Sequence, residues 1–137
     1  MKLFIDMNVV LDVLARREPW FAHSAAVLSL VDHGKAEGFI AAHTVTTLDY
    51  LLSKYHGREK AAAAFVDLLG LVRAANVGHD TLLKALSLQW SDLEDAVQAV
   101  CALQIGVDYL VTRDPRGFQT VSVPVATPSE LLAILSA

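Results

Sequence analysis

The sequence begins with a short apolar run that is followed at once by an acid. Leu3 to Ile5 are apolar, Asp6 follows, and from Val9 onward the apolar residues recur at the spacing of a helix. An apolar strand at the start of such a chain usually runs through the middle of a sheet, which would place the acid at the strand's carboxyl end. Ligands of open α/β sheets bind at that edge. We expect Asn8 to cap the following helix, and the rest of the chain is searched for acids that would meet Asp6.

Length and composition favour one α/β domain spanning residues 1–137. The chain is long enough for one domain with a core and too short for two. Its 54% hydrophobic content and mean hydropathy of +0.43 favour a sheet that helices cover on both faces. Because no apolar run approaches the roughly 20 residues of a membrane span, and the start resembles no signal peptide, we expect no membrane association. The single cysteine, Cys101, excludes an internal disulfide and suits a reducing cytoplasm.

The charge balance and the missing motifs exclude several classes of site. A net charge of -4 does not favour a general nucleic-acid binder. A nucleic-acid substrate would therefore need local basic groups, and metal ions that offset the acids. The sequence has no Gly-rich phosphate loop and no Cys/His cluster with zinc spacing, which argues against nucleotide-loop and zinc sites. The five histidines are scattered, and we expect them to be structural or exposed rather than metal ligands.

Strand and helix patterns alternate along the chain without a repeat or a linker. Strands are expected at 3–5, 38–42, 71–77, 108–112 and 121–125, and helices at 9–14, 20–33, 45–55, 58–69, 79–88, 91–106 and 131–135, the last begun by residues 128–130. Such alternation with right-handed crossovers predicts a parallel sheet with helices on both sides.

A second acidic stretch opens the helix at 91–106. Ser91 and Glu94 predict a capping box, and Asp92 suits the positive end of the helix dipole. Asp95 has no such explanation, because it shares a helix face with alanines in an apolar run. A lone carboxylate on such a face is costly to bury without a cation or strong donors. Asp95 is therefore a candidate site residue, and Asp92, on the same side, is a candidate assistant.

A third acid, Asp114, follows the strand at 108–112 and would share the sheet edge with Asp6. Asp114 also opens a good turn sequence, and Asp6 has an alternative reading as a helix N-terminal charge. Asp49, in the helix at 45–55, faces either the site or solvent, and the sequence leaves this open. Carboxylates held close together repel one another and need a cation. Oxygen ligands with retained waters suit Mg²⁺ or Mn²⁺.

Together these stretches resemble a PIN domain. The matching segments are 4–12, 92–96, 108–114 with Phe118, and 125–131, in order along essentially the whole chain. The resemblance implies a three-layer α/β/α sandwich around a five-stranded parallel sheet, and a metal-dependent ribonuclease. Many small single-domain members of the family are VapC-type toxins of toxin–antitoxin pairs.

By this resemblance, three acids fall on the family's acidic site positions and would hold Mg²⁺ or Mn²⁺; these are Asp6, Asp95 and Asp114. Asn8 and Thr112 match the polar residues that usually lie beside them. The family's remaining acid is a Glu early in the third helix, where this chain has Thr47. Asp49 lies two residues further on, roughly 200° around the helix. Either Asp49 reaches the site through a shifted helix, or the protein works with fewer acids.

The chemistry implied by the resemblance is hydrolysis of an RNA phosphodiester. A bound Mg²⁺ would polarise the phosphate and lower the pKa of a bound water. Arg113 and Arg116 lie beside the expected site and either hold phosphates or are solvated surface charges. A groove near the early helices, where Trp20 and Phe21 lie, receives the antitoxin in toxins of this family, and homodimers are common.

Two other readings of the sequence compete with a ribonuclease. The displaced acid of the third helix leaves open a PIN-fold nucleic-acid-binding module with weak or no nuclease activity. A small phosphatase of the haloacid dehalogenase type also begins with a strand and an acid. That family requires a second acid where this chain has Asn8, so we disfavour it.

Overall fold

A single five-stranded parallel sheet organises the molecule. The computed structural model describes residues 1–118 and 121–137. The strand order is β3-β2-β1-β4-β5, so the first strand is central, as the sequence predicts. Phe4 of β1 aligns with Phe39 on one side and with Leu110 on the other. The strands are β1 (Lys2–Ile5), β2 (Glu37–Ala41), β3 (Arg73–Ala75), β4 (Tyr109–Val111) and β5 (Val125–Ala126).

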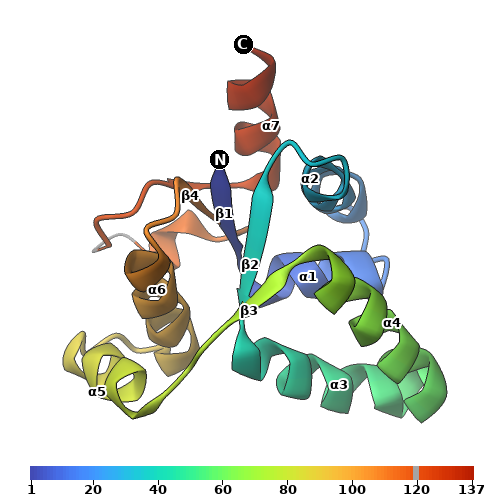
Figure 1. Ribbon diagram of the computed structural model, residues 1–137, viewed down its shortest axis with the longest axis horizontal. Coiled ribbons are helices and arrows are strands. Elements are labelled where there is room, and N and C mark those ends of the chain that lie inside the picture. The colour runs from blue at the N-terminus through green and yellow to red at the C-terminus, as the bar shows by residue number, and fades with distance from the viewer. Residues whose placement is uncertain (119–120) are drawn as a thin grey trace.

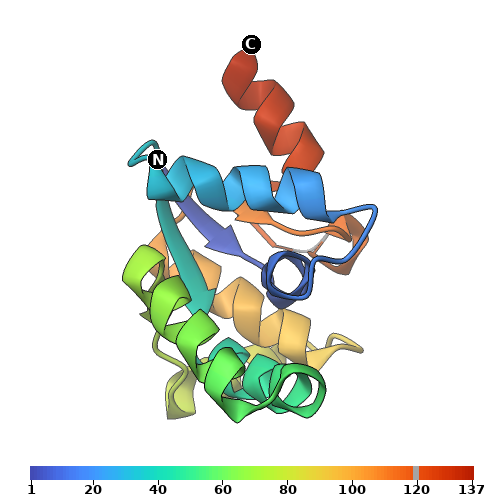
Figure 2. The ribbon, with the colours of Figure 1, turned by 90° about the vertical axis from the view of Figure 1, so that its right-hand side faces the viewer.

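Helices cover both faces of this sheet, which confirms the predicted α/β/α sandwich. They are α1 (Met7–Leu14), α2 (Phe21–Asp32), α3 (Ala42–His56), α4 (Arg58–Leu71), α5 (His79–Ser87), α6 (Leu93–Ile105) and α7 (Pro128–Ser136), with a short 3₁₀ helix, η1 (Pro115–Phe118). Figure 1 shows α5 and α6 on one side of the sheet and α1 to α4 on the other. Figure 2, turned by 90°, shows α1 end-on beneath α2.

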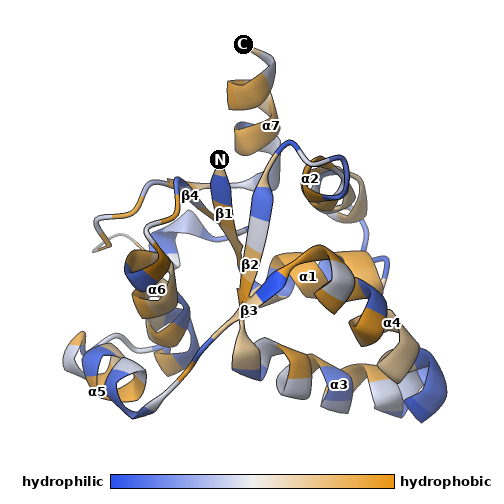
Figure 3. Ribbon diagram, in the orientation of Figure 1, coloured by the Kyte–Doolittle hydropathy of each residue, from blue (hydrophilic) through white to orange (hydrophobic). Residues whose placement is uncertain are grey.

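Side-chain alternation along the strands divides the core into two clusters. Leu3 and Ile5 of β1 point into a cluster that includes residues of α1 to α4, whereas Phe4 points into a cluster built largely on α6. This is the period-two pattern of a strand that is buried on both faces. Figure 3 shows the apolar residues along β1 and α6. Cys101 is buried in the second cluster, as expected of a small core residue.

Several element boundaries differ from the sequence predictions. The strand expected at 71–77 is only Arg73–Ala75, because helix α4 continues to Leu71. The strand expected at 121–125 is instead the two-residue β5, which begins after Pro124, a residue with no N–H to donate to a neighbouring strand. The helix expected at 45–55 begins three residues earlier, at Ala42, directly after β2. None of the helices in the described ranges is long and apolar enough to cross a membrane.

Candidate acidic site at the carboxyl ends of the strands

Adjacent parallel strands bring Asp6 and Asp114 to the same edge of the sheet. Ile5 of β1 aligns with Val111 of β4, and the Asp6 amide donates to the Val111 carbonyl at 2.9 Å. Asp6 is the residue that caps α1, with an extended backbone, and its carbonyl accepts from the first turn. The prediction that Asn8 caps this helix is therefore wrong. Asn8 is the second helical residue and is exposed, because the helix starts directly after the acid.

Two neutral groups hold the Asp6 carboxylate, which is 3% exposed. The Gln98 side-chain amide donates to its Oδ1 at 2.7 Å, and the Thr112 hydroxyl donates to its Oδ2 at 2.8 Å. Burial raises the pKa of Asp6, while these two hydrogen bonds and nearby backbone amides act in the opposite direction. Because neither side-chain donor carries a charge, they orient the carboxylate without neutralising it, and a cation would be attracted to it.

The Thr112 hydroxyl also connects Asp6 to Asp114. While donating to Asp6, it accepts a hydrogen bond from the Asp114 backbone amide at 3.1 Å. One side chain thus fixes the relative positions of the residues that follow β1 and β4. The sequence places Thr112 beside the acids by resemblance, and the structure shows the contacts through which it acts.

The start of α6 differs from the predicted capping box. Asp92, not Ser91, is the cap, and its Oδ1 accepts from the Asp95 amide at 3.2 Å. Aspartate caps a helix as well as serine does, so the acid nearer to the first turn takes this role. Glu94 therefore does not take part in a capping box. Its carboxylate pairs instead with the His43 imidazole at the start of α3.

Asp95 lies within a cluster of carboxylates. Burial and the nearby charges of Asp92, Asp6, Glu94 and Asp114, in that order of effect, raise the pKa of Asp95 to about 7. A carboxyl group titrating this high is one whose charged form lacks a compensating cation. Of the predicted acids, Asp6 and Asp114 thus both contribute to the raised pKa of Asp95.

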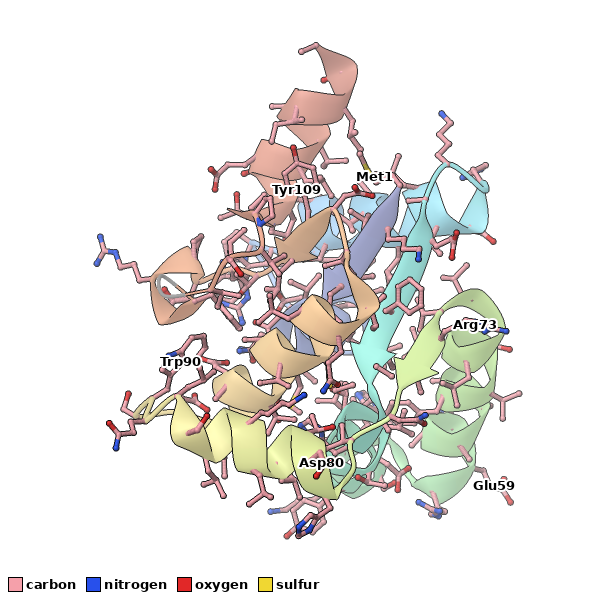
Figure 4. All side chains as sticks on the ribbon, turned by 60° about the vertical axis from the view of Figure 1, so that its left-hand side comes forward. Met1, Glu59, Arg73, Asp80, Trp90 and Tyr109 are labelled. Atoms are coloured by element: carbon pink, nitrogen blue, oxygen red, sulfur yellow. The ribbon has the colours of Figure 1, made fainter. Side chains whose placement is uncertain are left out.

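The 3₁₀ helix η1 packs against two of these acids at Gly117. A Cβ placed on Gly117 would lie 3.0 Å from Asp95 Oδ2 and 4.0 Å from Asp114 Oδ2. The helix is anchored by Phe118, whose ring meets Trp90 edge-to-face with centroids 5.9 Å apart. Figure 4 shows Trp90 projecting from the connection between α5 and α6. The missing side chain at Gly117 therefore leaves room for the acids.

The structure does not bring Asp49 to this cluster. Its carboxylate forms an ion pair with Arg58 of α4 and accepts a hydrogen bond from Ser53 at 3.2 Å. Asp49 is also not among the carboxylates that raise the pKa of Asp95. Helix α3 instead places His43 next to Glu94, beside the acids. The sequence signal for this contact is a histidine directly after a predicted strand, and pairing with Glu94 is a structural role.

The two arginines beside the site differ in their partners. Arg113 Nε lies 2.7 Å from Asp12 Oδ2, and its guanidinium stacks on the Trp20 ring, 3.9 Å from the centroid. Arg113 is thus engaged by a buried carboxylate of α1, and this contact argues against a phosphate-binding role. Arg116, on η1, is exposed. Of the two, Arg116 is the one available to a bound phosphate.

The donor chemistry of the cluster fits a hard divalent cation. Asp6, Asp95 and Asp114 offer oxygen donors only, which Mg²⁺ and Mn²⁺ prefer. Within residues 1–118 and 121–137, no group of three His, Cys, Asp or Glu side chains stands close enough to enclose a metal ion in the present rotamers. Asp95 is partly exposed and Asp114 is exposed, which gives both side chains room to rotate toward a shared cation.

Gln98 is the residue of this site that sequence reasoning missed. It is fully buried, and both ends of its amide are hydrogen-bonded within the site. The available signal was a lone amide among the small and apolar residues of 96–102, three positions after Asp95.

Comparison with known proteins supports the fold and names a family. The family profile described as "PIN domain" matches residues 2–116. The chain is 25% identical over 134 residues to Ribonuclease VapC1 of Aquifex aeolicus, covering 94% of this chain and 92% of that protein. Among solved structures, DNA-bound VapBC from Salmonella typhimurium superposes with a TM-score of 0.72 at 15% identity, covering 93% of this chain and 98% of that one. VapC20 from Mycobacterium tuberculosis, described as a Sarcin-Ricin loop cleaving toxin, gives 0.68 at 15% identity, covering 85% and 93%.

Proposed function

Because the chain belongs to the PIN-domain family, we propose that it is an endoribonuclease that depends on Mg²⁺ or Mn²⁺ and hydrolyses RNA phosphodiester bonds. The observation that carries this proposal is the buried Asp6 carboxylate, which accepts hydrogen bonds from two neutral side chains and has no cationic partner among them. It stands in one electrostatic cluster with Asp95 and Asp114. The similarity to a protein named as a ribonuclease supports the same reaction class.

In this proposal Asp6, Asp95 and Asp114 hold the cation. When bound, the ion supplies a polarised phosphate and a water of lowered pKa. Thr112 keeps Asp6 and Asp114 in register through its two hydrogen bonds. Arg116, exposed on η1, contacts a phosphate of the RNA. The overall charge of -4 means that the cation and this local basic group must offset repulsion between the protein and its substrate.

The test is RNA cleavage by the purified chain with Mn²⁺ and with a chelator. Cleavage is expected with Mn²⁺, and it should be lost in Asp6→Asn and in Asp95→Asn while circular dichroism shows a retained fold. Asp49→Asn is the matched control, because Asp49 is paired with Arg58 rather than with the cluster. Cleavage that survives in Asp6→Asn, or that is lost in Asp49→Asn alone, would contradict this assignment of the site.

We further propose that the chain is the toxin of a toxin–antitoxin pair. The supporting relatives include a VapBC complex and a protein described as a toxin–antitoxin complex from Klebsiella pneumoniae. Trp20 is 39% exposed and lines a cavity of about 370 Å³ with Pro19, His23 and Arg113. This cavity is where we expect an antitoxin segment to bind. Expression of the wild type in a bacterial host should arrest growth, and Asp6→Asn should not.

The second candidate is a PIN-fold RNA-binding module with little nuclease activity. The observation that favours it is that α3 places His43, not an acid, beside the cluster. The same cleavage assay separates the two functions: RNA binding without Mn²⁺-dependent cleavage would support the module.

Light scattering would test the expectation of a homodimer.

A further inference from the structure

Gln98 lies on the face of α6 that packs against the start of α1. Its side-chain Nε2 donates to Asp6 Oδ1 at 2.7 Å, and its Oε1 accepts from the Met7 backbone amide at 3.0 Å. Gln98 is 0% exposed, as are its helix neighbours Ala96 and Ala99. A buried amide is costly unless it is hydrogen-bonded, and an apolar side chain would fill the same space without needing partners. The polar groups of Gln98 are thus explained by Asp6 and Met7.

The two hydrogen bonds of Gln98 connect α6 to the start of α1. An aspartate in the capping position ordinarily directs its carboxylate to an amide of the first turn. Here the Gln98 carbonyl takes the Met7 amide, and the Gln98 NH₂ group draws the Asp6 carboxylate toward α6. A carboxamide can do this because it carries a donor and an acceptor on one planar group. Glutamate or methionine could not make both contacts.

Gln98 carries no charge, and this matters as much as its geometry. Asp12, on α1, is fully buried beside the guanidinium groups of Arg113 and Arg17, which balance its charge. Asp6 receives hydrogen bonds from an amide and a hydroxyl instead, so its negative charge is not balanced by a fixed cationic side chain. Asp12 is therefore a carboxylate that stabilises the fold through its ion pairs, whereas Asp6 is the carboxylate that can bind a cation from solution.

We propose that Gln98 is a positioning residue of the acidic site, which holds the Asp6 carboxylate in a fixed orientation toward a divalent cation. The inference rests on the proposed metal-dependent function. It assigns to Gln98 an effect on cation affinity that a residue serving only the core would not have.

The test measures Mn²⁺ binding through the paramagnetic resonance signal of free Mn²⁺, with wild type, Gln98→Met and Asp6→Asn. Methionine is close to glutamine in size but can make neither hydrogen bond. We expect Gln98→Met to bind Mn²⁺ about tenfold more weakly than wild type, as for other residues that orient a metal ligand. Asp6→Asn sets the scale for loss of a proposed ligand.

Val27→Ala is the matched stability control. Val27 is fully buried on α2 in the other core cluster, so its truncation should lower the melting temperature without changing Mn²⁺ affinity. If Gln98→Met does not fold, Gln98→Asn replaces it, because it keeps the amide but is one methylene too short to reach both partners. Its Mn²⁺ affinity is likewise expected to fall.

The outcomes separate this inference from the function on which it rests. Wild type that binds Mn²⁺ together with a folded Gln98 variant of equal affinity would overturn the role of Gln98 and leave the nuclease intact. Wild type that shows no Mn²⁺ binding, with Asp6→Asn indistinguishable from it, would overturn both. If Val27→Ala weakens Mn²⁺ affinity as much as Gln98→Met does, Gln98 acts only as a core residue.

Discussion

Asp6 and Asp12 are both buried carboxylates, the first at the start of α1 and the second within it, yet their partners differ. Burial is the main cause that raises the pKa of each. Asp12 is offset by the charges of Arg113 and Arg17, whereas Asp6 is offset by hydrogen bonds from neutral groups. Burial alone therefore does not mark a functional acid. The charge of the groups that contact a buried acid says more about its role than burial does.

Thr112 offers a test of this site at the level of one hydroxyl group. Thr112→Val keeps the shape of the side chain but removes the donor to Asp6 and the acceptor for the Asp114 amide. We expect RNA cleavage to fall by about tenfold or more, in line with the loss of a group that orients a ligand. Thr112→Ser keeps the hydroxyl and should retain most activity. Equal cleavage rates in the two variants would remove the hydroxyl from the mechanism.

The raised pKa of Asp95 predicts how stability depends on pH. The carboxyl titrates near 3.8 in its ordinary state and at about 7 in the fold, so between these values the folded chain holds a proton that the unfolded chain has lost. The free energy of unfolding should therefore fall as pH rises from about 4 through about 7. Without added metal, we expect a lower melting temperature at pH 8 than at pH 5.5.

The contribution of Asp95 is isolated by substitution. Asp6 and Asp12 also have raised pKa values and act in the same direction, so part of the pH dependence should remain in Asp95→Asn. The decrease between pH 5.5 and 8 should nevertheless be smaller in Asp95→Asn than in wild type or in Asp49→Asn. An unchanged decrease in Asp95→Asn would show that this carboxyl is not the titrating group.

Among the structural elements, η1 shapes the space that the acids share. Gly117→Ala would place a methyl group 3.0 Å from Asp95 Oδ2, so the carboxylate must shift by a few tenths of an ångström. Because catalysis is sensitive to small displacements of reacting groups, we expect a several-fold loss of cleavage with the fold retained. The assay is RNA cleavage at fixed Mn²⁺ concentration.

Gly70→Ala is the control for this substitution. Gly70 lies within α4, and a Cβ there would meet nothing within 4 Å. Alanine is favoured over glycine in a helix by up to about 1 kcal/mol, so Gly70→Ala should gain stability and keep full activity. If both alanine variants cleave RNA like wild type, the close approach at Gly117 has no functional consequence.

Features that depend on neighbouring residues in the sequence were the ones that could be predicted. The strand-then-acid units at Asp6 and Asp114 were predictable, because an apolar run and the residue after it are neighbours in sequence. Helix starts were less predictable, since adjacent polar residues compete for one capping position, as Asp92 and Ser91 do. Gln98 was not predictable, because its partner Asp6 lies 92 positions away and tertiary packing alone brings them together.

For the whole molecule, cation binding should appear as added stability. A ligand that binds only the folded state at 100 times its dissociation constant adds about 2.7 kcal/mol. For a chain of 137 residues this corresponds to a rise in melting temperature on the order of 10 °C. We expect Mg²⁺ to raise the melting temperature of wild type in differential scanning calorimetry. Asp6→Asn should show a much smaller rise, and equal rises would indicate binding elsewhere.

The order of strands in the sheet has a consequence for synthesis of the chain. The central strand, β1, is made first, but its neighbour β4 begins at Tyr109. The acids are divided in the same way, because Asp6 follows β1 and Asp114 follows β4. Because β4 lies beside β1 in the sheet, a nascent chain cannot assemble the acid cluster until the segment through Asp114 has been synthesised and has folded.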